Sequence, residues 1–285
     1  MRTPYERIAE ARSLLVDAGL SPDEAAFDAE VLARHALGWD RARLLADGRD
    51  PAPPGFDATF EALITRRANR EPVSQILGRR EFWGLDFDVT RDVLTPRPET
   101  ELVIEEALAF AREHPCHALL DVGTGSGCIA LSVAHEVPGA RVVAVDISDA
   151  ALAVARGNAQ RLGLADRVHF QHADLLAGIE GPFDLVLSNP PYMRADEATG
   201  LQPEVARFEP HSALFAGDDG LAVIRPLLAE VPRVLAPGGR LILEFGMGQD
   251  AAVAAAAQGT GWTVVRIRHD LQGIPRTAVL TRAEN

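Results

Sequence analysis

The strongest constraint on the fold is the alternation of short apolar runs with helical segments from residue 118 onward. The apolar runs have the length and composition of buried strands and cover residues 118–122, 141–145, 168–170, 183–188 and 240–245. Apolar residues at helical spacing occupy the intervals at 128–136, 150–162 and 221–235. This alternation favours parallel strands joined by crossover helices. We therefore expect an α/β fold with a Rossmann-like, doubly wound, mostly parallel sheet, completed by two final strands at 262–267 and 277–281.

The N-terminal region has a different pattern, in which helices are separated by short turns. Ser21, Pro22 and Glu24 supply a capping box and a proline at the first helical position, and together they predict a helix start. Apolar residues recur at helical spacing both before and after this point. The pattern predicts a small helical bundle over residues 1–74.

A linker and a second domain follow the bundle. Leu85, Phe87 and Val89 alternate with polar residues, which indicates a short strand and a hairpin-like linker over residues 75–95. Residues 96–101 then open a further helix, and the alternating strands and helices come after it. We assign residues 96–285 to the α/β domain.

Composition limits the partners of this chain. The formal net charge is −13, and an acidic balance opposes nonspecific attraction to phosphate backbones, so a nucleic acid is a disfavoured partner. Nowhere do eighteen apolar residues run together, and the N-terminus has no apolar stretch of signal-peptide length. We expect a cytoplasmic monomer without a membrane partner. The two cysteines offer no metal-ligand cluster, so no metal site is expected.

An Asn-Pro-Pro-Tyr turn at residues 189–192 directly follows one of the expected strands. A residue before proline is driven out of the α region and each proline fixes its own φ, so Asn189 and the Pro190 carbonyl are held in one extended geometry. Two rigid acceptors beside the Tyr192 ring suit a planar group that carries an NH2. We expect Asn189, Pro190, Pro191 and Tyr192 to bind the substrate, with Asn189, Pro190 and Tyr192 acting in catalysis. The alternative is a plain turn, because Asn-Pro is a common turn dipeptide.

A glycine-rich loop follows the first strand of the α/β domain. Its residues are Gly123, Thr124, Gly125, Ser126 and Gly127, and such glycines let a ligand approach the backbone. The spacing departs from the dinucleotide pattern, and residues 119–132 include no basic side chain. The loop therefore suits S-adenosylmethionine better than a pyrophosphate. A purely structural tight turn is the alternative interpretation.

Acidic residues at two other strand ends extend this cofactor site. Asp146 ends the second strand about twenty residues after the loop, where a carboxylate can accept both ribose hydroxyls of a nucleoside. Its alternative role is to cap the helix after Ser148. Asp174 and Leu175 follow the third strand and are expected beside the adenine. The alternative for Leu175 is a role in the core only.

Taken together, these motifs resemble those of the class I S-adenosylmethionine-dependent methyltransferases, and more narrowly the HemK/PrmC family of peptide chain release factor N(5)-glutamine methyltransferases. The resemblance covers essentially the whole chain. Beyond the loop and the Asn-Pro-Pro-Tyr turn, it rests on the segments at 80–83, 94–101 and 208–210.

The resemblance implies both a reaction and roles for these residues. It implies methyl transfer from S-adenosylmethionine to the glutamine of a Gly-Gly-Gln tripeptide in release factors, the bundle being the substrate-recognition domain. The glycine loop, Asp146 and Asn189 would contact the cofactor, and residues 189–192 would hold the glutamine. Two alternatives stay open, namely the same chemistry on a ribosomal protein glutamine and adenine-N(6) methylation of nucleic acid.

Three further features near the expected site are Arg97, Glu209 and the segment at 193–218. Arg97 either reaches the cofactor carboxylate or belongs to a linker, and Glu209 either helps to hold the peptide or is a solvated loop charge. Residues 193–218 have few helix or strand signals and are expected to form a long loop, a candidate substrate lid.

Overall fold

The computed structural model describes residues 2–282, which divide into two compact units. The first unit runs to Gly78 and also contains Gln202–Phe208. The second contains Arg79–Leu201 and continues from Glu209. This division differs from the expected one in two places: the hairpin at 79–88 belongs to the larger unit, and residues 202–208 belong to the smaller one. The chain therefore leaves the α/β unit once and returns to it.

The first unit is helical. Its helices are α1 (Pro4–Asp17), α2 (Pro22–Leu37), α3 (Arg41–Asp47), α4 (Phe56–Ala68), α5 (Val73–Leu77) and α9 (Pro203–Phe208). Helix α2 begins as the sequence predicts, because the Ser21 side chain accepts from the Glu24 amide and the Glu24 side chain accepts from the Ser21 amide. Leu15, Leu32 and Phe60 are fully buried in the core of this unit.

Partly buried ion pairs hold α9 against the other helices of the first unit. Arg67 on α4 contacts Asp28 on α2 at 2.6 Å and Glu204 on α9 at 2.8 Å, and Arg70 contacts Glu204 at 2.8 Å. The Gln75 side-chain amide also donates to the Phe208 carbonyl at 2.8 Å. The sequence pattern predicts only a long loop here. It missed α9 because charged partners distant in sequence stabilise this helix, and apolar periodicity does not.

The second unit opens with an antiparallel hairpin of β1 (Arg79–Phe82) and β2 (Leu85–Asp88). The large sheet consists of β3 (Ala118–Val122), β4 (Arg141–Asp146), β5 (Val168–His172), β6 (Phe183–Ser188), β7 (Leu235–Glu244), β8 (Trp262–His269) and β9 (Pro275–Arg282). Its α-helices are α6 (Glu101–Glu113), α7 (Cys128–Glu136), α8 (Asp149–Arg161), α10 (Ile224–Glu230) and α11 (Asp250–Gly259). Short 3-10 turns occur at η1 (Pro98–Thr100), η2 (Ala195–Gly200), η3 (His211–Ala213) and η4 (Val231–Arg233).

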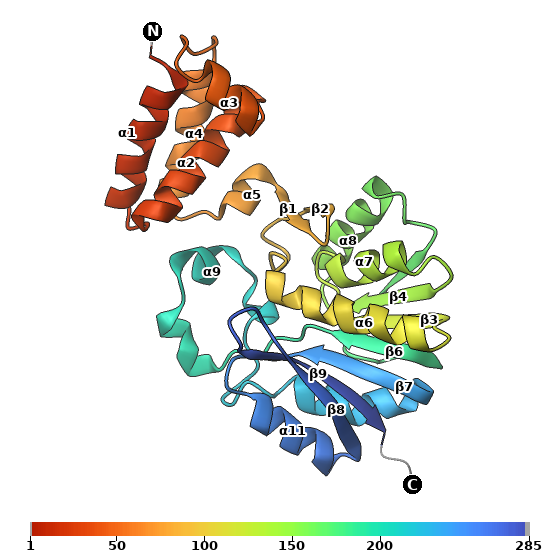
Figure 1. Ribbon diagram of the computed structural model, residues 1–285. Coiled ribbons are helices and arrows are strands. Elements are labelled where there is room, and N and C mark those ends of the chain that lie inside the picture. Colours follow the sequence, from red (N-terminus) through yellow and green to blue (C-terminus); the bar gives the residue numbers. More distant parts are fainter. Residues whose placement is uncertain (1, 283–285) are drawn as a thin grey trace. The chain divides into compact units, whose positions relative to one another are not determined.

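The strand order explains where a ligand can bind. It is β5-β4-β3-β6-β7-β9-β8, with β9 antiparallel to both neighbours and the remaining pairs parallel (Figure 1). The chain builds outward from β3 to one edge and then returns to start the other half at β6. The reversal between β3 and β6 is a topological switch point, and in such sheets a ligand binds there, beyond the carboxyl ends of the strands.

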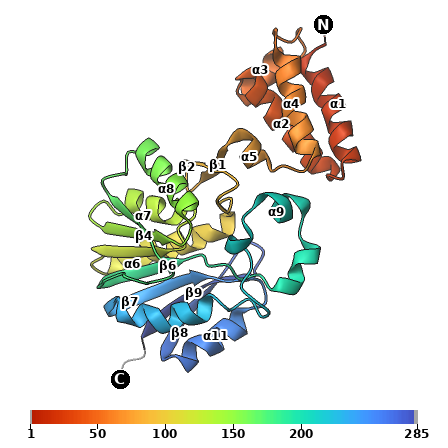
Figure 2. The same cartoon turned by 180° about the vertical axis from the view of Figure 1, so that it is seen from behind.

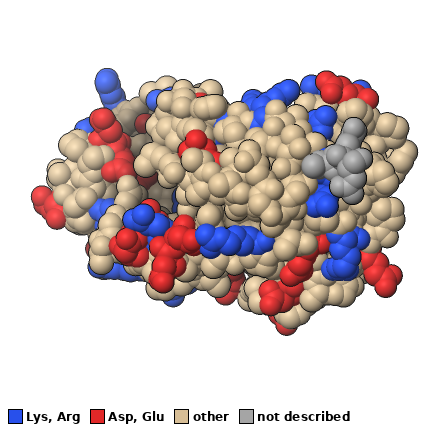
Figure 3. Space-filling view, turned by 90° about the horizontal axis from the view of Figure 1, so that it is seen from below, with Lys and Arg blue, Asp and Glu red and all other residues tan. Residues whose placement is uncertain are grey.

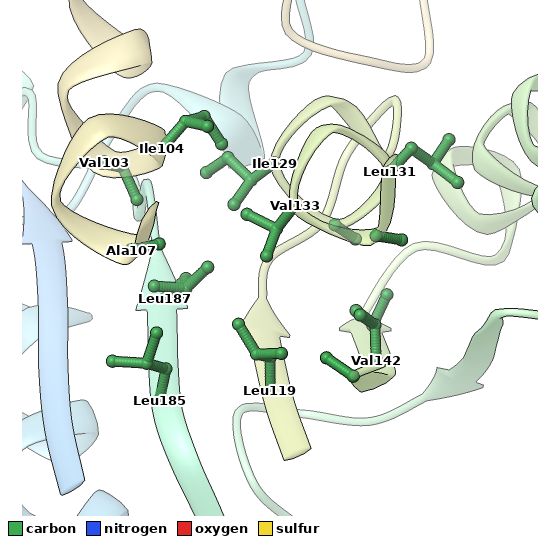
Figure 4. Close-up of a cluster of buried hydrophobic side chains, with 14 of the residues drawn as sticks. Val103, Ile104, Ala107, Leu119, Ile129, Leu131, Val133, Val142, Leu185 and Leu187 are labelled. Atoms are coloured by element: carbon green, nitrogen blue, oxygen red, sulfur yellow. The ribbon is translucent and has the colours of Figure 1, made fainter. Parts of the chain in front are cut away.

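Both faces of the sheet are covered by helices, as the view from behind also shows (Figure 2). Figure 4 shows one layer, in which Ile104 of α6 and Ile129 of α7 lie over Leu119 and Leu185 of the sheet. Helices α10 and α11 pack on the opposite face. Strands buried on both faces read as continuous apolar runs, which is why the sequence located them. The expected fold class is confirmed.

The segment expected as one helix over 221–235 is shorter in the structure. Helix α10 ends at Glu230, and a 3-10 turn with Pro232 at its centre leads into β7. Proline has no backbone N–H, so it cannot continue the α-helical hydrogen bonding. Over residues 2–282, no helix is both long and apolar enough to cross a membrane.

Candidate active site

A cavity of about 320 Å³ lies at the carboxyl ends of β3, β4 and β6, in the second unit. Of the residues expected in the site, it is lined by Gly123, Thr124, Gly125, Ser126, Asp146, Asp174, Leu175, Asn189 and Pro191. Gly127, Pro190 and Tyr192 do not line it. The structure thus brings most of the residues expected to bind cofactor and substrate to one cavity, at the switch point of the sheet.

The glycine-rich loop is held by hydrogen bonds to three residues of β3 and β4. The amides of Gly123 and Thr124 both donate to the Val145 carbonyl at 2.9 Å, and the Gly125 amide donates to the Asp146 carboxylate at 2.9 Å. Asp121 accepts from the Thr124 hydroxyl at 2.6 Å. These bonds tie the loop to β4 and β3, so its backbone has a defined shape where it lines the cavity.

Gly127 allows close packing between α7 and α8. It has a φ of +83° and precedes the first residue of α7. A Cβ placed there would lie 3.0 Å from Leu131 Cδ1 and 3.2 Å from Ala155 Cβ, which is closer than ordinary contact. The absent side chain therefore lets α7 and α8 approach each other behind the loop.

Asp121 is a buried carboxyl beneath the loop. One of its oxygens accepts from the Thr124 hydroxyl and from the Ala130 amide, and the other has no hydrogen-bond partner among the described residues. Desolvation by burial raises the pKa of Asp121 to about 7. Asp121 thus orders the loop from below without facing the cavity.

Asp146 combines two backbone contacts with a place in the cavity wall. Its Oδ2 accepts from the Gly125 amide and its Oδ1 from the Ser148 amide, both at 2.9 Å. The Ser148 hydroxyl, and not Asp146, caps α8 by accepting from the Ala151 amide. An ionised carboxylate has about four acceptor positions, so about two remain for a ligand.

The wall beyond β5 is formed in part by Asp174 and Leu175. Asp174 is exposed and Leu175 is half-buried. Leu175 has a φ of +48°, which is uncommon for a residue other than glycine and directs the chain sharply at the end of this strand.

The Asn-Pro-Pro-Tyr turn divides its residues between the cavity and the protein interior. Asn189 lines the cavity, and its side-chain Nδ2 donates to Thr100 Oγ1 at 3.0 Å. Pro190 is buried. The Tyr192 hydroxyl donates to Glu244 at 3.2 Å, and burial beside Glu244 raises the pKa of Tyr192 well above its usual value. The tyrosine hydroxyl therefore keeps its proton and bonds a carboxylate that does not line the cavity.

Thr100 and Glu244 are two residues of this region to which the sequence motifs assign no role. Thr100 lines the cavity and donates to Glu244 at 2.7 Å. Burial raises the pKa of Glu244 to about 7. A signal for Glu244 exists in the sequence, because it is an acid at the end of an apolar run. Its significance needs the strand order, since Ser188 is paired with Leu243 and Glu244 thus ends its strand beside Asn189.

Arg97 and Glu209 form a pair at the rim of the cavity. Arg97 lines the cavity, and its Nη2 contacts both Glu209 oxygens, at 2.7 and 2.8 Å. Glu209 is only 5% exposed, and burial raises its pKa. The expectation of a solvated loop charge is therefore wrong for Glu209, which is a buried partner of Arg97.

This fold and site define a Rossmann-like methyltransferase. Residues 101–205 match the family model of the methyltransferase small domain. Among solved structures, a methyltransferase from Pyrococcus furiosus is 18% identical, covers 77% of this chain and 99% of its own, and superposes with a TM-score of 0.53. The hMettl16 catalytic domain is 17% identical, covers 78% and 81%, and has a TM-score of 0.57. At these identities the likeness concerns the fold.

The chain belongs to the release factor glutamine methyltransferase family. Residues 6–78 match the PrmC N-terminal domain. The release factor glutamine methyltransferase of Cereibacter sphaeroides is 49% identical over 89% of this chain and 90% of its own. That of Rhodospirillum rubrum is 46% identical over 90% and 78%, and that of Caulobacter vibrioides is 43% identical over 92% and 90%. The resemblance to the HemK/PrmC family is thus confirmed.

Proposed function

We propose that this protein transfers a methyl group from S-adenosylmethionine to the side-chain amide nitrogen of the glutamine in the Gly-Gly-Gln motif of peptide chain release factors. The observation that carries the proposal is the placement of Asn189. Its side chain lines the same cavity as the glycine-rich loop and Asp146, and its NH2 group is already bonded to Thr100. Family membership supports the same reaction, since the relatives are named release factor glutamine methyltransferases.

The residues of the cavity fit S-adenosylmethionine. Asp146 keeps acceptor capacity for a ribose diol, and Ile147 and Leu175 offer apolar surface for a flat base. The loop offers close backbone approach through Gly123 and Gly125. Among the residues that line the cavity, acidic Asp146 and Asp174 suit a cationic ligand. When bound, S-adenosylmethionine supplies an electrophilic methyl group.

The protein must orient a poor nucleophile, because the lone pair of an amide nitrogen is delocalised into its carbonyl. The Asn189 side-chain oxygen would accept one N–H proton of the glutamine amide. The carbonyl of Pro190, which adjoins Asn189 but does not itself line the cavity, would accept the other. Two acceptors on one nitrogen favour its pyramidalisation and aim the lone pair into the cavity. A strong base is not required, because the alkylated nitrogen is very acidic and can release its proton to a neighbouring oxygen or to water.

The charge distribution favours a protein substrate over a nucleic acid. Residues 1–71 contain ten arginines and thirteen acids. On the face shown in Figure 3, acidic and basic side chains are interspersed, and the basic ones form no continuous patch. Enzymes that methylate a base in nucleic acid rely on cationic contacts to the backbone.

Substrate identity can be tested directly. We expect purified protein with labelled S-adenosylmethionine to label a release factor, and mass mapping to place the label on the glutamine of the Gly-Gly-Gln loop. Ribosomal proteins and DNA are assayed in parallel as competing substrates. A label on a ribosomal protein glutamine or on adenine, with none on the release factor, would overturn the proposal.

Asn189→Ala tests the role of the amide acceptor. The variant should lose at least about a hundredfold in kcat, because a positioned polar group that acts in the transition state is worth several kcal/mol. Its affinity for S-adenosylmethionine should fall much less, and calorimetry measures that separately. Near-normal turnover of Asn189→Ala would contradict the amide-orienting mechanism.

A further inference from the structure

A chain of hydrogen bonds continues from Asn189 into the protein interior. The Asn189 NH2 donates to Thr100 Oγ1 at 3.0 Å, and the Thr100 hydroxyl donates to Glu244 Oε2 at 2.7 Å. The Tyr192 hydroxyl donates to the other oxygen of Glu244 at 3.2 Å. Thr100 and Glu244 are each 1% exposed. Glu244 does not line the cavity, so any effect it has on a ligand passes through its neighbours.

The hydrogen atoms available in this series of hydrogen bonds determine which end of the Asn189 side-chain amide faces the cavity. The Thr100 hydroxyl donates its single proton to Glu244, and when Glu244 is ionised its carboxylate can only accept. The Thr100 oxygen then has lone pairs free to accept a hydrogen bond. Of the two ends of the Asn189 side-chain amide, only the NH2 end can donate to them. The reversed amide would place two acceptor oxygens against each other about 3.0 Å apart. The side-chain oxygen of Asn189 is therefore the end left for the cavity.

We propose that Glu244 is a positioning residue that acts through Thr100 to hold the Asn189 side-chain oxygen toward the substrate amide. The inference rests on the proposed function, because a glutamine NH2 needs an acceptor and would be repelled by the NH2 end of Asn189. Glu244 also holds the last residue of the Asn-Pro-Pro-Tyr turn through the Tyr192 hydroxyl. One buried carboxylate thus orients both ends of the turn.

The bond from Asn189 to Thr100 and the bond from Thr100 to Glu244 can be tested with paired variants. Glu244→Met removes the acceptor and frees the Thr100 proton to bond the Asn189 oxygen, which allows the amide to reverse. Glu244→Gln is the conservative partner, since its side-chain oxygen can accept from Thr100 while its NH2 faces the Tyr192 hydroxyl. Thr100→Val removes the hydroxyl at nearly constant volume, and Thr100→Ser keeps it. Glu106→Met is the matched control, because Glu106 is also buried, at 3% exposed, but contacts Arg266 and Arg268 away from the cavity.

For the release factor substrate, we expect Glu244→Met and Thr100→Val to lower kcat at least about tenfold, with KM for S-adenosylmethionine changed less than about threefold. Glu244→Gln and Thr100→Ser should recover most of the loss, and Glu106→Met should keep wild-type kcat. Thermal unfolding of each variant shows that it is folded. Wild-type kcat in Glu244→Met or Thr100→Val would overturn the proposal, as would equal losses in the conservative variants.

A second measurement does not depend on turnover. The side-chain NH2 resonances of Asn189 in the free protein are assigned by their loss in Asn189→Ala. They should shift in Glu244→Met and Thr100→Val and return toward the wild-type position in Glu244→Gln and Thr100→Ser. Unchanged resonances in Glu244→Met would overturn the proposal. If the wild-type protein fails to methylate any release factor, the proposed function fails, and the resonances still decide whether Glu244 orients Asn189.

Discussion

At the scale of single residues, the side chains around the cavity act on the backbone as well as facing a ligand. Asp146 lines the cavity and also accepts from two backbone amides, those of Gly125 and Ser148. Asp121 orders the same loop without reaching the cavity. Asp146 and Asp121 therefore both support the shape of the glycine-rich loop, and substitution of either acid should alter that shape.

Replacing Asp146 with alanine tests its role toward the cofactor. The variant loses both the remaining acceptor positions and the bond to the Gly125 amide. We expect the affinity for S-adenosylmethionine to fall by about 1.5 to 3 kcal/mol, the range for hydrogen bonds to a charged group. Calorimetry measures this loss. Asp149→Ala is the matched control, since Asp149 is an exposed acid on α8 that does not line the cavity. Equal affinity in Asp146→Ala and Asp149→Ala would exclude the ribose role.

At this scale, the sequence indicates which residue types stand at which positions, but not which of them face the cavity. Asn189 and Asp146 follow apolar strands, and strand ends are where such folds place chemistry, so their place in the cavity could be anticipated. Tyr192 and Gly127 belong to the same motifs yet do not line the cavity. The Tyr192 hydroxyl bonds Glu244, and Gly127 leaves room for Ala155, both of which are distant in sequence.

At the scale of elements, strands and helices with strong local patterns were predictable and α9 was not. The capping box of α2 and the buried strand β6 carry their own signals in consecutive residues. Helix α9 is six residues long and is held by Glu204. An isolated helix of this length is unstable in water, so only tertiary contacts can account for it.

The ion-pair cluster around α9 gives a prediction for the first unit. Arg67→Met removes the guanidinium that pairs with both Asp28 and Glu204, and it leaves the buried Asp28 carboxylate without this partner. Burial already raises the pKa of Asp28 against the effect of Arg67. We expect a loss of about 3 kcal/mol in the free energy of unfolding, measured by urea denaturation. The double variant Asp28→Leu with Arg67→Met should regain part of it. A loss below about 0.5 kcal/mol in the single variant would contradict a stabilising role for the pair.

At the scale of the whole molecule, stability should depend on pH through buried carboxyls. Glu244 and Asp121 both have a pKa of about 7 in the folded protein, because burial disfavours their charged forms. Glu99 adds to the shift of Glu244, whereas Arg276, Thr100 and Tyr192 oppose it. Between the unfolded pKa and about 7, the folded state binds more protons, so this contribution to stability is full at low pH and is lost as pH rises through about 7.

Glu244→Gln isolates the contribution of this carboxyl. The variant has no charge to bury, so its stability relative to the wild type should increase by about 2 kcal/mol between pH 5.5 and pH 8.5. Urea denaturation at the two pH values measures the change, and Asp121 cancels because both proteins contain it. A stability difference that does not vary with pH would show that the Glu244 pKa is not raised.

By itself, the sequence determined the fold class, the position of the glycine-rich loop and the polar residues at the strand ends. Hydrophobic periodicity, capping and proline restriction act among neighbouring residues, so they can be read along the chain. Only the tertiary structure decided which of these residues meet. Thr100 and Glu244 are 144 residues apart and bond each other because α6, which begins next to Thr100, packs on the sheet face that includes β7. The physical reason is that a hydrogen bond needs a partner at about 3 Å, and distant partners are brought within that range by packing.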